Sequence, residues 1–205
     1  MRRESSTVVV LAGDVGDGLL AELGRSSNIS VVRSPAATPG APEPAPLRPG
    51  WETGALALRE AGRRQSAYVV VADDPLADVA AAWCAMWEMA GGAAGFEERA
   101  AEALTAWRDN RFELPDYYLV MAPAQPEGKG SGPDLYLGPL RAARPRRVAV
   151  AGLTGVTGDP GQADRVLAAL RSLAHGPWWP PLDELIDAAR RFYAGGLAET
   201  QPSPA

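Results

Sequence analysis

Four uninterrupted apolar runs constrain the fold of this chain more than any other feature. They cover residues 7–12, 67–72, 117–122 and 147–151, and each carries apolar side chains at consecutive positions rather than at every second one. Strands with this pattern are covered on both faces, as in parallel sheets whose connections are helices. A weaker run at 29–32 has polar neighbours and suits the edge of such a sheet.

Helical patterns fill the intervals between these runs. The expected helices cover residues 18–25, 52–65, 76–90, 96–108, 162–174 and 182–193, and a short helix precedes the last strand. Asp74-Pro75 and Asp159-Pro160 each place a capping aspartate before a proline at a first helical position. The alternation predicts a three-layer α/β/α sandwich around a mostly parallel, five-stranded sheet of Rossmann-like or flavodoxin-like type, with strand order 2-1-3-4-5.

The chain of 205 residues has the length of one domain with irregular segments. We expect a single α/β domain over residues 1–198 and a disordered tail over 199–205. Residues 34–50 contain six prolines and predict an extended loop, partly of polyproline-II type. Residues 124–134 predict a second loop, rich in glycine and proline.

The charge balance narrows the classes of partner. The net charge of −5 and the pI of about 5.0 disfavour nucleic acid and anionic membrane surfaces. No apolar run approaches the roughly 20 residues of a membrane span, and the single cysteine, Cys84, excludes an internal disulfide framework. We therefore expect a cytoplasmic protein without membrane or nucleic-acid partners.

Glycine and aspartate follow the expected strands where ligands bind in open parallel sheets, outside the carboxyl ends. Glycine-rich turns that open a helix can also cradle phosphate. The candidate ligand-binding residues are Gly13, Asp14, Gly16, Asp17, Asp73 and Gly155. Each also has a purely conformational interpretation, because both residue types are common in turns.

The aspartates favour a cation over a bare phosphate at the carboxyl ends of the strands. Asp14 and Asp73 are the candidate ligands for Mg²⁺, the one cofactor that the pattern allows. No Gly-Lys-Ser/Thr follows Gly18, which excludes a P-loop. A magnesium-dependent or nucleotide-like ligand site, or an enzyme that cleaves N-glycosidic bonds with such carboxylates, is the alternative function.

The sequence does not contain a recognisable set of catalytic residues, such as a nucleophile with its base. His175 is the one histidine, it stands at a helix end, and no serine lies in a nucleophile-elbow pattern. We therefore expect a non-enzymatic accessory or regulatory domain that acts through protein contacts, with another protein or with copies of itself.

Tryptophans are the candidates for those contacts. Trp83 and Trp87 share one helix face, where they pack into the core or meet a partner. Trp178 and Trp179 stand in a proline-bounded linker and are the predicted interaction residues, one as an internal clamp and one toward a partner or ligand.

Arginines gather in two segments that precede strands. Arg63-Arg64 precedes the third strand, and Arg141, Arg144, Arg146 and Arg147 precede the fifth. Because the candidate aspartates follow strands, we expect acidic groups at one end of the sheet and basic groups at the other. These arginines are either a solvated turn or a site for an acidic partner.

Overall fold

The computed structural model describes residues 6–13, 15–33, 49–87, 92–123, 134–153 and 161–200. Its five strands match the apolar runs: β1 (Thr7–Ala12), β2 (Ile29–Val32), β3 (Tyr68–Val71), β4 (Tyr117–Pro123) and β5 (Val148–Leu153). The helices are α1 (Asp17–Leu23), α2 (Gly50–Ala61), α3 (Ala77–Trp87), α4 (Gly92–Arg108), α5 (Arg141–Ala143), α6 (Gln162–Arg171) and α7 (Leu182–Thr200), with a π-helix η1 (Tyr136–Leu140) before α5.

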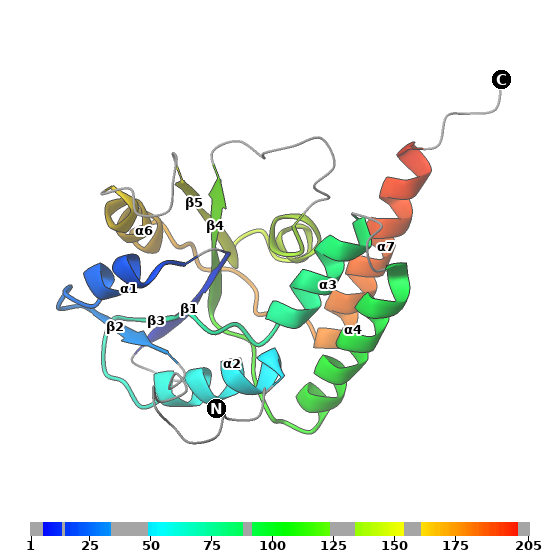
Figure 1. The fold of residues 1–205 in the computed structure, drawn as a ribbon. Helices are drawn as coiled ribbons and strands as arrows, with labels where there is room; N and C mark the ends of the chain where they lie inside the picture. Colours follow the sequence, from blue (N-terminus) through cyan, green and yellow to red (C-terminus); the bar gives the residue numbers. More distant parts are fainter. Residues whose placement is uncertain are drawn as a thin grey trace, which may run out of the picture.

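The strands form one sheet in which every pair is parallel, so the predicted α/β fold class is confirmed (Figure 1). The observed order, β2-β3-β1-β4-β5, corrects the predicted order 2-1-3-4-5 by exchanging the first and third strands. Val9 and Val10 at the centre of β1 have no solvent exposure, in keeping with the middle position of this strand. β2 therefore connects through α2 to its direct neighbour, β3.

Alternate residues of each strand supply two separate cores. Val8 and Val10 of β1 face the larger core, which α2, α3, α4, η1 and α7 cover. Val9 and Leu11 face the smaller core under α1 and α6. Both faces of the sheet are thus closed, as the uninterrupted apolar runs require, and each fully buried valine or leucine stabilises the fold by about 1.5–3 kcal/mol.

Trp83 belongs to the larger core. It is fully buried on α3, and its ring packs against Trp87 and against Phe96 of α4, at centroid distances of 5.8 and 5.5 Å. Tyr193 of α7 adds a further ring 4.9 Å from Trp87. The tryptophan face of α3 therefore joins three helices. None of the described helices combines the length and the apolar character needed to cross a membrane.

Candidate functional site

The turn after β1 needs glycine for conformational reasons. Gly13 has a φ of +110°, and a Cβ atom here would lie 3.1 Å from the carbonyl oxygen of Met121 on β4. Gly16 is the N-cap residue of α1 and offers no side-chain cap. Asp14 and Gly155, the two other loop candidates, lie outside the described residues.

Asp17 and Asp73 are the candidate aspartates that the described residues include. Asp17 opens α1 and pairs with Arg33 at 2.7 Å, although its side chain is 93% exposed, so solvent screens the pair strongly. Asp73 follows β3 and is half-buried. Because β1 and β3 are parallel neighbours, Asp73 lies at the same end of the sheet as the turn after β1. Within the described ranges no three His, Cys, Asp or Glu side chains gather around a point that could hold a metal ion. The Asp14–Asp73 magnesium pair remains a prediction.

Leu19 and Leu20 follow Gly18 at the start of α1. Both are buried, and both pack in the smaller core with Val9 and Leu11 of β1. A P-loop would place a lysine and a hydroxyl residue after its last glycine, to reach phosphate oxygens and Mg²⁺. In the first turn of α1, two leucines buried in the core therefore occupy the positions at which a P-loop has its phosphate-binding and Mg²⁺-binding side chains.

Asp74 forms a buried polar cluster that the sequence did not indicate. Its side chain accepts hydrogen bonds from the Tyr118 hydroxyl of β4 (3.1 Å), from the Leu76 backbone N–H (2.9 Å) and from the Tyr136 hydroxyl of η1. The bond to Leu76 is the local role that the Asp-Pro pattern predicts; the bonds to the two tyrosines are not. Asp74 therefore ties β3, β4 and η1 together inside the larger core.

Burial raises the pKa of the Asp74 carboxyl to about 6, because solvent no longer stabilises the charge; the bonds from Tyr136, Leu76 and Tyr118 oppose this, and the charge of Asp134 adds to it. Burial also raises the pKa of Tyr118 and Tyr136 well above the usual range, so both phenols remain donors near neutral pH. The cluster is enclosed by protein, which favours a structural role over contact with a ligand.

A hollow lies at the opposite end of the sheet, near the amino ends of β1, β4 and β5. It has a volume of about 770 Å³. Its lining combines polar and charged side chains with apolar ones: Ser6, Thr7, Val8, Leu58, Glu113, Leu114, Pro115, Asp116, Tyr117, Arg147, His175 and Trp178. Asp116 is held in place here, because its Oδ2 accepts the Val8 backbone N–H at 2.8 Å.

Arg147 anchors the wall of this hollow. Its guanidinium lies between two rings, 5.0 Å from the centroid of Tyr117 and 4.9 Å from that of Trp178. It donates to the carbonyl oxygens of Asp116, Gly176 and Pro177, at 3.1, 2.7 and 2.9 Å. A buried cation stacked between aromatic rings is worth up to about 2 kcal/mol. Arg147 thus fixes the linker that carries Trp178.

The two linker tryptophans have different environments. Trp179 is buried, donates its indole N–H to the Pro115 carbonyl at 2.7 Å and packs on Tyr118. Trp178 is 45% exposed, the highest exposure among the large apolar side chains of the described residues. The structure therefore places Trp179 as an internal clamp and Trp178 on the surface.

Arg144, Arg146 and Arg147, the arginine turn, place positive charge along the segment 175–178, which ends in Trp178. Arg144 donates to the Trp178 carbonyl at 2.7 Å, and Arg146 donates to the His175 carbonyl at 3.2 Å. Other described arginines pair with carboxylates: Arg33, Arg63, Arg64, Arg99 and Arg190. Among the described residues, no carboxylate lies within ion-pair distance of the arginine turn.

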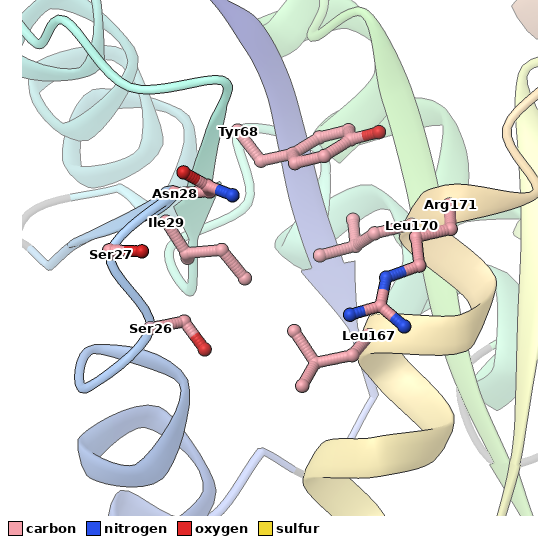
Figure 2. Close-up of a pocket in the computed structure, with 8 residues that line it drawn as sticks. All are labelled: Ser26, Ser27, Asn28, Ile29, Tyr68, Leu167, Leu170 and Arg171. Atoms are coloured by element: carbon pink, nitrogen blue, oxygen red, sulfur yellow. The ribbon is translucent and has the colours of Figure 1, made fainter.

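A smaller hollow of about 250 Å³ opens near the amino ends of β2 and β3 (Figure 2). Ser26, Ser27 and Asn28 border it on one side, and Leu167, Leu170 and Arg171 of α6 border it on the other. In Figure 2 the Arg171 guanidinium is drawn between the side chains of Leu170 and Leu167, on the α6 side of the hollow and opposite Ser26. The carboxyl ends of α1 and α6 both lie here, which disfavours an anionic ligand.

No family model, curated protein or solved structure matches this chain.

Proposed function

We propose that this protein is a non-enzymatic accessory or regulatory domain that acts through protein contacts. The contact surface is the amino-end surface, which we define as Trp178, the arginine turn and the hollow beside them. The observation that carries the proposal is Trp178, 45% exposed and stacked on a buried arginine. Tryptophan and arginine are among the residues that most often dominate binding energy in interfaces.

The rigidity of Trp178 supports this role. The indole stacks on Arg147, and the backbone carbonyl of Trp178 accepts a hydrogen bond from Arg144. The next residue, Trp179, is clamped to Pro115. Ordering an interface side chain costs about 0.5–1.5 kcal/mol on binding. A partner that covers Trp178 avoids most of that cost.

The charge of the arginine turn indicates the chemistry of the partner. Arg144 and Arg146 donate to carbonyl oxygens, so their charge has no carboxylate complement in the described residues. An acidic protein surface would supply one. Glu113 and Asp116 in the hollow give the surface a mixed sign, which a uniformly anionic nucleic acid would match less well.

A photo-crosslinking experiment tests the proposal. Benzoylphenylalanine replaces exposed Pro177 beside the tryptophan, or Phe192 on α7 as the control position. We expect a discrete partner adduct from position 177 and none from position 192.

Binding to the purified partner is a second test. Trp178→Ala should weaken binding by about tenfold or more. Arg146→Glu should also weaken binding, and added salt should weaken the binding of the parent protein in the same way. Equal binding by Trp178→Ala and the parent protein would overturn the proposal.

The strand order favours a second candidate function, a small-ligand site at the carboxyl ends. The connection that leaves β1 runs to one side of the sheet, to β2, and the connection that leaves β4 runs to the other side, to β5; ligands of open α/β sheets bind at such a switch point. The Gly13 turn lies at that point, beside Met121 of β4. Thermal-shift measurements with Mg²⁺, with nucleotides and with both together test it, because a ligand that binds only the folded chain raises its melting temperature. No shift with any of them would remove this candidate.

A further inference from the structure

The hollow beside Trp178 has walls of two kinds. Leu58 and Leu114 supply apolar surface, and Trp178 adds an indole that is 45% exposed. Glu113 and Asp116 add two carboxylates. The volume of about 770 Å³ is that of pockets that enclose whole small molecules. A single side chain of a bound protein therefore fits within it.

Asp116 is the more firmly held of the two carboxylates. Its Oδ2 accepts the Val8 backbone N–H at 2.8 Å, and its backbone carbonyl accepts the Arg147 guanidinium at 3.1 Å. In the part of the chain that the structure describes, no hydrogen bond or ion pair reaches Asp116 Oδ1 or the Glu113 carboxylate. The hollow therefore offers acceptors to a donor group that carries positive charge.

Arg147 also lines the hollow, but its charge is offset within the fold. It is 5% exposed, it donates to three carbonyl oxygens, and it lies between two aromatic rings. Carbonyl oxygens and ring faces carry partial negative charge and attract a cation. With His175 neutral, the two carboxylates of the lining also outnumber this one guanidinium. The lining therefore favours a cation over an anion.

We propose that the hollow receives a basic side chain, arginine or lysine, of the protein that binds the amino-end surface, an inference that rests on the function proposed above. Both side chains combine an apolar stem with a cationic head, which matches apolar walls beside two carboxylates. Arg144 and Arg146 lie outside this lining, and an acidic group complements them. The partner segment that fits therefore carries an acidic residue next to a basic one.

A single blocked arginine tests the hollow without the partner. N-acetyl-arginine methylamide is titrated into the full chain, and N-acetyl-citrulline methylamide, which has nearly the same shape but no charge, is the control ligand. Nuclear magnetic resonance follows the Val8 amide and the Trp178 indole N–H. We expect saturable chemical-shift changes at both groups with millimolar arginine probe, and about tenfold weaker binding of the citrulline probe.

Asp116→Asn removes the charge and keeps an oxygen that can accept the Val8 N–H. This variant should bind the arginine probe about tenfold more weakly, because a charge-assisted hydrogen bond is lost. Asp164→Asn is the matched control, since Asp164 is exposed in the first turn of α6 and does not line the hollow. It should bind the probe like the parent chain. The purified partner should distinguish the two variants in the same way.

Equal binding of the two probes, or equal binding by Asp116→Asn and the parent chain, would overturn the proposal. Tighter probe binding by an Arg2→Gln/Arg3→Gln double variant would also overturn it, because the hollow would then hold the chain's own arginines, which precede Ser6 of the lining. Crosslinking at position 177 tests the surface separately. An adduct without probe binding would refute only the basic side chain, and probe binding without an adduct would refute the protein partner.

Discussion

At the scale of single residues, Asp74 makes the stability of the fold depend on pH. Burial raises the pKa of its carboxyl to about 6 in the folded chain, from 3.8 for the free group. Between these two values the folded chain binds more protons than the unfolded chain, so the contribution of Asp74 falls as the pH rises. The full change is about 3 kcal/mol, at about 1.4 kcal/mol for each pKa unit.

Asp74→Asn should remove this pH dependence, because an amide does not titrate in that range. We expect the free energy of unfolding of the variant, relative to that of the parent chain, to rise by about 2 kcal/mol between pH 4 and pH 7. Urea unfolding at a series of pH values measures it, with Glu113→Gln at an exposed position as the control. Parallel curves for the parent chain and Asp74→Asn would contradict the prediction.

The tyrosine contacts of Asp74 illustrate what local patterns miss. The Asp-Pro pair predicts a cap, and the bond to Leu76 is formed two residues away. Tyr118 and Tyr136, however, are 44 and 62 residues away along the chain. A buried tyrosine needs a partner for its hydroxyl, and this is the one signal in the sequence that could have directed attention to an acceptor. It does not say which one.

At the scale of elements, α2 meets the segment before α3 at a single tight contact. A Cβ added to Gly54 of α2 would lie 2.3 Å from the Pro75 nitrogen, and the atoms that it meets belong to the backbone, which cannot swing aside. The close approach places α2 directly over the Asp74–Pro75 corner, so glycine is required here for space rather than for its φ angle.

Gly54→Ala should therefore lower the free energy of unfolding by about 3 kcal/mol or more, or prevent folding. Gly95→Ala in α4 is the matched control, because nothing lies within 4 Å of its added Cβ; it should raise stability by about 0.5–1 kcal/mol through helix propensity. Urea unfolding of both variants compares them. A mild effect at position 54 would show that α2 shifts away from the corner at little cost.

The sequence predicts most elements within a few residues of their observed bounds, because buried strands and amphipathic helices leave periodic patterns. It predicts a short helix before β5 but does not indicate its π form. Tyr136–Leu140 spans only five residues and contains a proline, so its sequence pattern does not show which type of helix it forms. The linker tryptophans show the same limit. Their proline-bounded setting predicts one clamp and one contact residue, but only the position of Pro115 decides that Trp179 is the clamp.

At the scale of the whole molecule, strand order is the feature that the sequence left open. β1 and β3 are both short, apolar and valine-rich, and right-handed crossovers connect either order. What separates them is pairing between distant segments, such as Val9 with Tyr117 and Val9 with Val70. The hollow at the amino ends was also hidden, because it is built from five separate stretches of chain.

The central place of β1 has a consequence for synthesis on the ribosome. β1 leaves the ribosome first among the strands, yet one of its two neighbours, β4, begins only at Tyr117. Until that segment emerges, a row of valines and a full set of main-chain groups on one flank of β1 stay uncovered. In the nascent chain this flank of β1 therefore stays exposed while the residues between β1 and Tyr117 are synthesised, a period in which a chaperone can bind it.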